Sequence, residues 1–267
     1  WISCPMRARR RSIVSSAVMQ LLASFRCRIR RLHCRAMRFD RDYYRRYYYD
    51  SRTAVTSRQE MRARARLIAA FTDHIGLPVR RILDAGCGIG LLRAPLRKLL
   101  PRASYVGLEV SDYLCERYGW EHGRIESYRP EKPFDLVICY DVLQYLDDRA
   151  AAGAIANFGH VCRGVLYLTA LTLRDWRYNC DRERTDSNVY LRPGEWYRTR
   201  LQRNFREVGA GFWIRRGAPL TTWELESLPD APSRGRSDRT RAQAGSARAS
   251  RTTESGSSRK RSRRSRA

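Results

Sequence analysis

The most constraining feature of the chain is a glycine-rich turn that follows an apolar run, I-L-D-A-G-C-G-I-G at residues 82–90. Nineteen residues after the last of these glycines, a second apolar run, Y-V-G-L-E, ends in the acid Glu109. Glycine turns let a ligand approach the backbone closely, and an acid at a neighbouring strand end can accept hydrogen bonds from sugar hydroxyls. The two features together predict adjacent strand ends that hold a nucleoside.

The spacing of the glycines separates two classes of ligand that contain a nucleoside. A dinucleotide fold uses G-x-G-x-x-G, whose third glycine would fall at position 91, and that residue is Leu91. Here the glycines stand at alternate positions, 86, 88 and 90, after Asp84 at the end of the apolar run. An oxidoreductase that binds a dinucleotide is therefore disfavoured.

From residue 80 onward apolar runs alternate with amphipathic stretches, which is typical of β-α units and a mainly parallel sheet covered on both faces. Before them, Ser57 and Glu60 form a capping-box pattern that predicts a helix ending before Gly76 and Pro78. Residues 172–193 are polar and loop-like, and residues 208–226 predict an antiparallel hairpin with its turn at 216–219. The expected strands are residues 81–85, 105–109, 124–127, 134–140 and 164–170, and the expected helices are residues 91–100, 111–118, 147–161 and 194–205.

Three motifs, in this order, resemble those of the class I S-adenosylmethionine-dependent methyltransferases. They are D-A-G-C-G-I-G at residues 84–90, Y-V-G-L-E-V-S at 105–111 and F-D-L-V-I-C-Y-D-V-L-Q-Y-L-D-D at 134–148. The resemblance covers about residues 77–226. It implies a Rossmann-like α/β fold: a seven-stranded, mainly parallel sheet with a C-terminal antiparallel hairpin and helices on both faces. It also implies an enzyme that transfers a methyl group from S-adenosyl-L-methionine.

The resemblance further implies roles for residues at the strand ends. Glu109 would bind both ribose hydroxyls, and Asp84 would orient the glycine loop, take the ammonium of the cofactor through a water, or serve the structure alone. At the end of the third strand either Ser127 or Glu126 would face adenine, and the sequence leaves that choice open. The expected cofactor-binding residues are Asp84, Gly86, Cys87, Gly88, Gly90, Glu109, Ser127 and Tyr140.

Methyl transfer from an activated sulfonium needs mainly the placement of a nucleophile, and a base where the acceptor must lose a proton. Asp141, which follows the fourth strand, is the candidate catalytic base. Gln144 and Tyr145 are candidate orienting groups, and simple packing at the start of the next helix is the alternative for both.

The sequence after the fourth strand disfavours two classes of methyl acceptor. The N-P-P-Y motif of amino-methylating enzymes is absent, and Cys139 is preceded by Ile138 rather than by proline, as RNA carbon methylation would require. A small-molecule acceptor is therefore expected. Its pocket would be formed by the tyrosine-rich residues 43–49 and the polar insert 174–192, unless their aromatic residues only pack the sheet edges. The insert residues in question are Trp176, Tyr178, Asp181, Asp186 and Tyr190.

Most of the formal net charge of +26 lies at the two ends of the chain. Residues 1–39 hold ten arginines and no acid, and residues 230–267 hold twelve basic residues and three acids, which leaves +7 for residues 40–229. We expect a disordered or non-native extension at 1–39, a methyltransferase domain at 40–229 and a disordered Arg/Ser-rich tail at 230–267. Within the domain, residues 40–76 would form a helical lid and 77–229 the α/β core. The basic ends leave open a nucleic-acid-binding protein with this fold, or an RNA or protein methyltransferase.

The eight cysteines contain no Cys-x-x-Cys pair, so neither a zinc site nor a disulfide framework is predicted. His33 with Cys27 and Cys34 matches no standard metal-site spacing. The apolar residues 13–25 are too short to span a bilayer and lack a clear cleavage site, and Met37 is the expected natural start. We therefore expect a cytoplasmic protein without a metal or a membrane span, and the oligomeric state is open.

Overall fold

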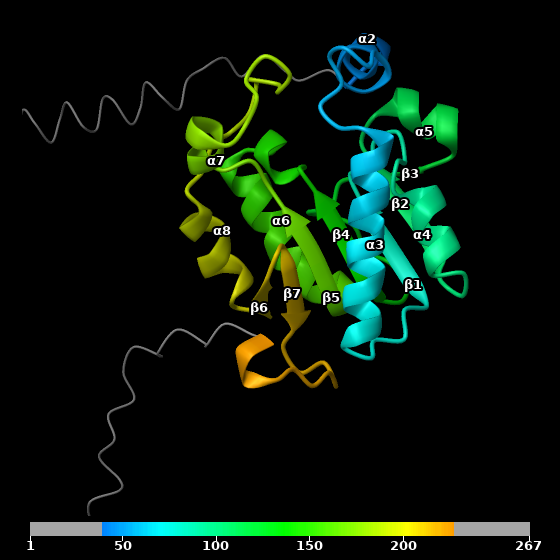
Figure 1. Cartoon of the computed structure of the whole chain (residues 1–267), viewed down its shortest axis with the longest axis vertical. Helices are drawn as coiled ribbons and strands as arrows, with labels where there is room; N and C mark the ends of the chain where they lie inside the picture. Colours follow the sequence, from blue (N-terminus) through cyan, green and yellow to red (C-terminus); the bar gives the residue numbers. More distant parts are fainter. Residues whose placement is uncertain (1–38, 227–267) are drawn as a thin grey trace, which may run out of the picture. The chain divides into compact units, whose positions relative to one another are not determined.

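The computed structural model describes residues 39–226, which form a seven-stranded sheet in the order β3-β2-β1-β4-β5-β7-β6 (Figure 1). Five neighbouring strands are parallel, and the sheet ends in an antiparallel pair, β6 and β7, beside β5. The predicted fold class is confirmed. The strands are β1 (Arg81–Ala85), β2 (Ser104–Glu109), β3 (Glu121–His122), β4 (Phe134–Tyr140), β5 (Cys162–Thr169), β6 (Phe205–Gly209) and β7 (Phe212–Arg215).

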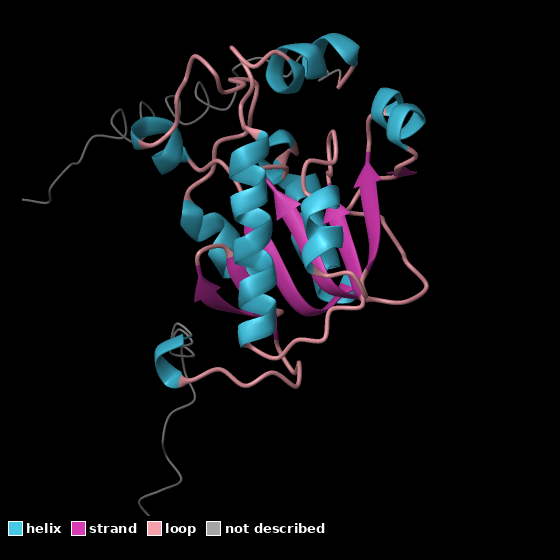
Figure 2. Cartoon of the chain, turned by 45° about the vertical axis from the view of Figure 1, so that its right-hand side comes forward, coloured by secondary structure: helices cyan, strands magenta, loops and turns pink. Residues whose placement is uncertain are grey.

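Helices cover both faces of the sheet (Figures 1 and 2). On one face, apolar residues of α3 (Arg58–His74) and α4 (Arg93–Leu99) form a buried cluster with β1, β4, β5 and β7. On the other face, α6 (Asp148–Val161) and α8 (Gly194–Leu201) form a second cluster with the same sheet. The short helix α5 (Asp112–Tyr118) follows β2. The connections at the carboxyl ends of the parallel strands are the part of this fold where a binding site can form.

Helix α3 begins at the predicted capping box. The Ser57 hydroxyl accepts a hydrogen bond from the Glu60 amide at 3.1 Å, and the Glu60 carboxylate accepts one from the Ser57 amide at 2.6 Å. Further along the helix, the ring of Phe71 stacks on that of Phe212 in β7, with centroids 4.0 Å apart. The cap thus fixes the start of α3, and apolar packing ties its body to the sheet.

The predicted strand at residues 124–127 is wrong. The strand that pairs with β2 is Glu121–His122, and residues 124–127 form a turn. The Asn157 side chain in α6 donates to the Ile125 carbonyl at 2.6 Å and to the Tyr128 carbonyl at 2.9 Å. A side chain from the neighbouring layer therefore satisfies carbonyl groups that a strand would have used in the sheet.

Residues 172–193 were predicted to be a loop, but they contain the helix α7 (Leu173–Tyr178). This helix begins with a second capping box, in which Thr172 and Asp175 exchange hydrogen bonds. The pattern T-x-x-D was present in the sequence, but the helix that it starts is only six residues long. A segment of that length has too few apolar repeats to show a helical period.

The C-terminal hairpin exists, but its turn lies at Ala210 and Gly211 instead of residues 216–219. Gly209, Ala210 and Gly211 have φ angles of 105°, 50° and 86°, a left-handed backbone that reverses the chain within two residues. Helix α8 ends at Leu201, four residues before the predicted end, and the chain then enters β6.

The predictions for the basic ends, for Met37 and for the cluster of His33, Cys27 and Cys34 fall outside the described residues. Within residues 39–226, no helix is long and apolar enough to cross a membrane. No group of three His, Cys, Asp or Glu side chains in the same range is placed to hold a metal ion.

The capping box of α3 gives a first test. Ser57→Ala removes the acceptor for the Glu60 amide, so the free energy of unfolding should fall by about 1 kcal/mol in urea titrations. Ser51→Ala, at an exposed residue of the preceding turn, is the control and should leave the urea midpoint unchanged. Equal midpoints for the Ser57 variant and the parent chain would contradict the role of the cap.

Candidate functional site

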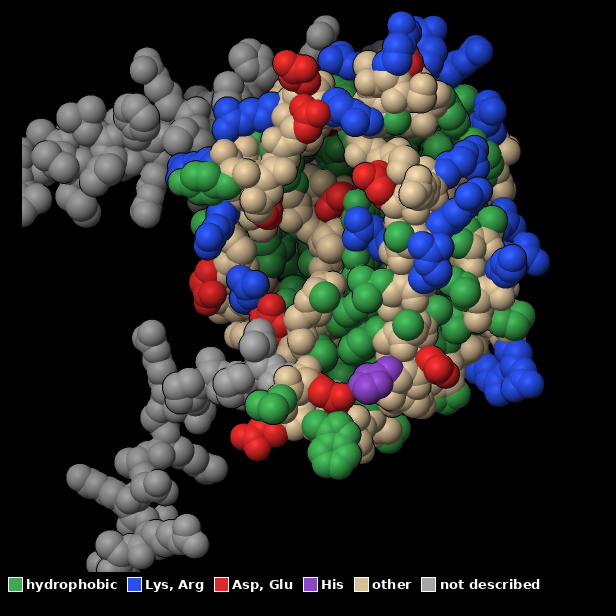
Figure 3. Space-filling model, in the orientation of Figure 1, with side chains coloured by type: hydrophobic (Ala, Val, Ile, Leu, Met, Phe, Trp, Pro, Cys, Tyr) green, Lys and Arg blue, Asp and Glu red, His purple; other side chains and the backbone are tan. Residues whose placement is uncertain are grey.

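A cleft of about 840 Å³ opens at the carboxyl ends of β1, β2 and β4. Figure 3 shows the surface hollowed below α2, with acidic side chains around the hollow and basic ones on the edge over α4 and α5. Residues of the tyrosine-rich segment and of the strand ends line this large compartment. They include Tyr43, Tyr44, Tyr48, Gly86, Gly88, Glu109, Ile125, Glu126, Tyr140, Asp141 and Tyr145.

A small compartment of about 140 Å³ adjoins the cleft on the other side of the glycine loop. Its lining adds residues from the loop, from α3 and from the polar insert, among them Asp84, Cys87, Met61, Gln144, Thr185 and Asp186. The two compartments share six lining residues, Tyr48, Gly86, Gly88, Tyr140, Asp141 and Tyr145. They are therefore two parts of one site.

The carboxylate of Glu109 holds the glycine loop to the end of β2. One oxygen accepts from the Gly88 amide at 2.9 Å, and the other accepts from the Val110 and Ser111 amides at 2.8 and 3.2 Å. Burial raises the pKa of Glu109, and these three amides oppose the rise. Since a carboxylate offers about four acceptor positions, capacity remains for a further donor in the cleft.

Trp120 supports the same loop from behind, and sequence reasoning missed it. Its indole N–H donates to the Gly88 carbonyl at 2.9 Å. A Cβ atom on Gly90 or on Gly107 would lie 2.5 Å from the indole ring, so both positions need glycine for this packing. The signal in the sequence is weak, because Trp120 and the loop are 32 residues apart.

The glycines of the loop consequently have different tasks. Gly90 lines neither compartment and makes room for Trp120, although it was expected to bind the cofactor. Gly86 faces the cleft and lies against Val142, whose Cγ2 would be 2.5 Å from a Cβ atom. Gly88 has a φ of 54°, and no atom lies within 4 Å of the position of its missing Cβ. It is the glycine that opens the backbone to a ligand.

Asp84 and Cys87 lie on the small compartment. The Asp84 carboxylate accepts a hydrogen bond from the Tyr105 hydroxyl. Burial raises the pKa of Asp84 to about 7, with the negative charge of Glu109 adding to the rise and the Tyr105 hydrogen bond opposing it. Burial also raises the pKa of the Cys87 thiol, which disfavours the reactive thiolate.

Between the two alternatives at the third strand end, the structure places Glu126 on the cleft. Ser127 is exposed, lines neither compartment and donates weakly to the Arg124 carbonyl at 3.3 Å. Glu126 accepts from the Arg124 guanidinium at 2.8 Å. Glu126 lies in the turn whose Ile125 and Tyr128 carbonyls are bound by Asn157. No local pattern in the sequence encodes the contact between Asn157 and this turn.

Asp141 follows β4 with a φ of 54°, which is uncommon for a residue other than glycine and is found at functional sites. Its carboxylate accepts from the Thr169 hydroxyl at 3.0 Å. Burial raises the pKa of Asp141, while Thr169 and the positive charge of Arg64 oppose the rise. A half-buried carboxylate that lines both compartments and has a raised pKa is suited to accept a proton.

Gln144 and Tyr145 occupy the loop after β4. The Gln144 amide donates to the Asp141 carbonyl at 2.8 Å, and its backbone carbonyl accepts from the Tyr190 amide at 2.7 Å. Gln144 therefore holds the Asp141 turn against the polar insert, which combines the orienting and packing roles. The Tyr145 hydroxyl instead accepts from the Tyr43 hydroxyl at 3.1 Å, across the cleft.

The tyrosine-rich segment forms α2 (Arg41–Tyr44) and a π-helical turn (Arg45–Tyr49) that roof the cleft. The rings of Tyr43 and Tyr47 lie together, as do those of Tyr44 and Tyr48, with centroids 4.9 and 5.5 Å apart. The Ser111 hydroxyl donates to the Phe39 carbonyl at 2.5 Å and anchors the start of the segment. The tyrosines thus pack on one another, and Tyr43, Tyr44 and Tyr48 line the cleft as well.

Of the insert residues singled out in the sequence, Asp186 is the one that lines the site. It is buried, and one carboxylate oxygen accepts from the Asn188 amide at 2.9 Å. Trp176, Tyr178, Asp181 and Tyr190 line neither compartment. The Arg184 guanidinium of the insert donates to the carbonyl of Ala54, in the turn that follows the tyrosine-rich segment, at 2.6 Å.

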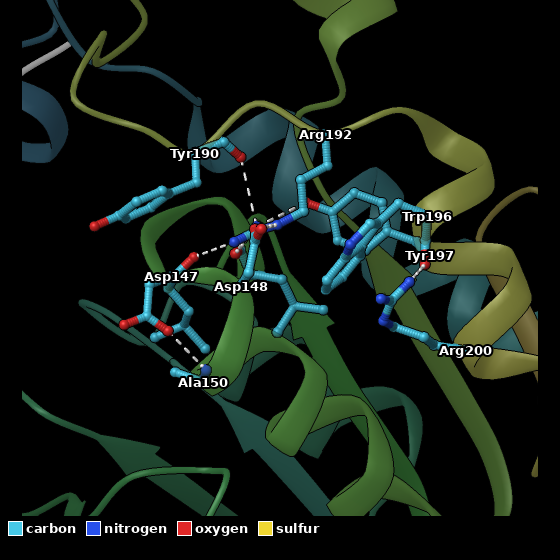
Figure 4. Close-up of polar contacts among 10 residues, drawn as sticks. Asp147, Asp148, Ala150, Tyr190, Arg192, Trp196, Tyr197 and Arg200 are labelled. Carbon is cyan, nitrogen blue, oxygen red and sulfur yellow. Dashed lines mark hydrogen bonds and ion pairs between the residues drawn. The ribbon is translucent and has the colours of Figure 1, made fainter. Parts of the chain in front are cut away.

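The buried Arg192 fixes the far end of the insert (Figure 4). Its guanidinium donates to the Leu143 carbonyl at 3.0 Å, to the Leu146 carbonyl at 2.5 Å and to the Asp148 carboxylate at 2.8 Å. The ring of Trp196 packs against it, 4.7 Å from centroid to guanidinium carbon. Arg192 thereby fixes the loop that carries Gln144 and Tyr145.

Residues 83–163 match the family model of a methyltransferase domain. The trans-aconitate 2-methyltransferase of Pseudomonas paraeruginosa is 29% identical over 97 residues, 33% of this chain and 35% of that protein. The protein of the same name from Pseudomonas aeruginosa is 30% identical over 98 residues, 34% of this chain and 36% of that protein. The chain spans about a third of the length of these curated relatives. The predicted resemblance to class I S-adenosylmethionine-dependent methyltransferases is confirmed.

Solved structures with a similar chain course include a magnesium protoporphyrin IX methyltransferase from Synechocystis PCC 6803 with bound SAH. It is 20% identical, with a TM-score of 0.47, over 65% of this chain and 93% of that one. The N-methyltransferase of Bradyrhizobium japonicum WM9 in complex with S-adenosyl-L-homocysteine is 19% identical, with a TM-score of 0.45, over 66% of this chain and 97% of that one.

The different roles of Gly88 and Gly90 predict different losses in the free energy of unfolding when each is replaced by alanine. Both have positive φ, so alanine at either should cost about 1–2 kcal/mol from the left-handed backbone. Gly90→Ala also forces a Cβ atom into Trp120 and should lose about 1–3 kcal/mol more through overpacking. Urea unfolding of both variants measures the difference, and equal losses would contradict the supporting role of Trp120.

The raised pKa of Asp84 predicts how stability depends on pH. The folded chain binds this proton more tightly than the unfolded chain, so the contribution is greatest at low pH and is lost as pH rises. The loss should run from about pH 4 to about pH 7 and reach at most about 4 kcal/mol. Asp84→Asn should lack this component in urea titrations across that range, whereas the exposed-site control Asp73→Asn should retain it. Parallel curves for the parent and Asp84→Asn would rule it out.

Proposed function

We propose that this chain is a class I S-adenosyl-L-methionine-dependent methyltransferase that acts on a small molecule. The observation that carries the proposal is the strand-end cleft, where Gly88 leaves space for a ligand beside the Glu109 carboxylate. Both residues lie within the part of the chain that matches the methyltransferase domain. The open backbone at Gly88 and the carboxylate beside it thus lie in the same part of the chain that resembles a methyltransferase domain.

The residues of the cleft fit the chemical groups of S-adenosyl-L-methionine. The unused acceptor positions of Glu109 suit ribose hydroxyls, and Ile125 and Glu126 lie on the same compartment, where adenine would fit. The cofactor also carries a sulfonium and an ammonium. The ring of Tyr140 and the carboxylates of Asp84 and Asp141, which line the small compartment, are favourable surroundings for those positive charges.

A bound cofactor would supply a methyl group attached to a positively charged sulfur. The methyl carbon would be the atom that the acceptor attacks, and the sulfur would leave as a neutral thioether. The chain has to place the acceptor and to keep water out, for which the tyrosine roof over the cleft is suited. Asp141 is the proposed base, because its half-buried carboxylate has a raised pKa and lines both compartments. Thr169 and Gln144 hold Asp141 in position through its side chain and its backbone carbonyl.

A small acceptor suits the dimensions of the site, because the tyrosine roof and the insert enclose it. The relatives' acceptor, trans-aconitate, is a carboxylic acid, and the acceptor of this chain need not be the same compound. A nucleic acid partner remains a prediction, and it rests on the basic ends of the chain. A cytoplasmic location also remains a prediction, and it rests on the cysteine usage. The five described cysteines are free thiols.

Calorimetry with S-adenosylhomocysteine tests the proposal directly. Glu109→Gln keeps the shape of the side chain but removes its charge, so binding should weaken by about tenfold or more through loss of a charge-assisted hydrogen bond. Glu116→Gln, an exposed residue of α5 outside the cleft, is the matched control and should bind like the parent. Circular dichroism of each variant establishes that it is folded.

Two results would contradict the proposed function. The first is a folded parent chain that binds neither S-adenosylhomocysteine nor S-adenosylmethionine. The second is a folded Glu109→Gln variant that binds S-adenosylhomocysteine as tightly as the parent does.

A further inference from the structure

All of the charged side chains that line the small compartment among the described residues are acidic. Three carboxylates line it, those of Asp84, Asp141 and Asp186, and no lysine or arginine is among its described lining residues. Three aromatic rings also line it, those of Tyr48, Tyr140 and Tyr145. This composition favours a positively charged ligand, in a chain whose overall charge is strongly positive.

Asp186 differs from the other two carboxylates in its partners. The Tyr105 hydroxyl donates to Asp84, and the Thr169 hydroxyl donates to Asp141. Asp186 is 6% exposed, and among the described residues it receives only the backbone amide of Asn188 and no side-chain donor or cation. A buried carboxylate without a cation is costly, and a ligand cation would remove that cost.

The arginines close to this region are committed elsewhere. Arg64 lies over the ring of Tyr140, 4.0 Å from its centroid, and donates to the Tyr140 and Tyr167 hydroxyls at 3.1 and 2.6 Å. Arg184 donates to the backbone carbonyl of Ala54. Neither arginine lines either compartment, so neither neutralises Asp186 from within the cavity.

The position of Asp186 connects it to the acceptor side of the site. It comes from the polar insert, outside the region that matches the methyltransferase domain. Burial raises the pKa of Tyr43 and Tyr145, and the negative charge of Asp186 adds to the rise of both. Its charge therefore acts on the phenols whose hydroxyls meet across the cleft.

We propose that the acceptor carries an ammonium group, which binds between the Asp186 carboxylate and the aromatic rings of Tyr48 and Tyr145. This inference rests on the proposed methyl-transfer function and names the chemical class of its acceptor. A polycarboxylate is disfavoured in the small compartment on the same ground, because it would meet three carboxylates and no lysine or arginine among the described lining residues.

The test uses the full chain saturated with S-adenosylhomocysteine and three probes in ligand-observed NMR titrations. Choline carries a quaternary ammonium, dimethylbutanol is its uncharged carbon isostere, and tricarballylate is a tricarboxylate. Choline should bind about tenfold more tightly than dimethylbutanol, and tricarballylate should not bind. Because S-adenosylhomocysteine already occupies the donor site with its own ammonium, choline then reports on the acceptor side.

Asp186→Asn is the informative variant, since its amide oxygen can still accept from the Asn188 amide. It should weaken choline by about tenfold while S-adenosylhomocysteine binding stays within twofold of the parent. Asp181→Asn, from the same insert but exposed and outside both compartments, is the control and should change neither. Tyr145→Phe should keep choline binding, and Tyr145→Leu should weaken it, because the ring and not the hydroxyl faces the cation.

Several outcomes would overturn the proposal and leave the methyl-transfer function intact. They are equal binding of choline and dimethylbutanol, tighter binding of tricarballylate than of choline, and choline binding that Asp186→Asn does not alter. Loss of S-adenosylhomocysteine binding in Asp186→Asn would assign this carboxylate to the ammonium of the donor instead. If the parent chain fails to bind S-adenosylhomocysteine at all, the proposed function and this inference both fall.

Discussion

The site depends on one residue, Gly88, whose backbone N–H and carbonyl are both held by side chains. Its N–H donates to the Glu109 carboxylate at the end of β2, and its carbonyl accepts from the Trp120 indole after α5. With both polar atoms bonded to protein, the backbone presents an open face where a Cβ atom would otherwise stand. The position of the loop, and hence of the cleft, is therefore set by two side chains from the neighbouring β-α unit.

Much of this arrangement could be predicted, because its signals are local. The alternate glycines, the acid that ends the second apolar run and the Ser57 capping box are patterns within a few residues, and each specifies a conformation by itself. The parts that could not be predicted depend on contacts between distant residues. Asn157 binds the Ile125 carbonyl of the expected third strand, and Trp120 fills the space beside Gly90. Where Glu126 and Gly90 lie relative to the cleft therefore becomes visible only in the folded chain.

The strand-end walls of the site and its roof come from different ranges of the chain. The matched residues 83–163 contain the glycine loop, Glu109 and Asp141, which form the walls at the strand ends. The tyrosine-rich segment and Asp186 lie outside that range and form the roof and one wall of the small compartment. Connections at strand ends can change without disturbing the sheet, so relatives that share only the matched range carry no constraint on the acceptor.

The roof and the glycine loop share one buried aromatic cluster. Tyr44 of the roof is buried against Leu114 of α5 and against Trp120, and Cys87 and Ile89 of the loop pack on the same cluster. The Trp120 indole that holds the Gly88 carbonyl is therefore also the surface on which the roof packs. Because close-packed side chains transmit displacements to their neighbours, the roof and the loop behave as parts of one packed unit.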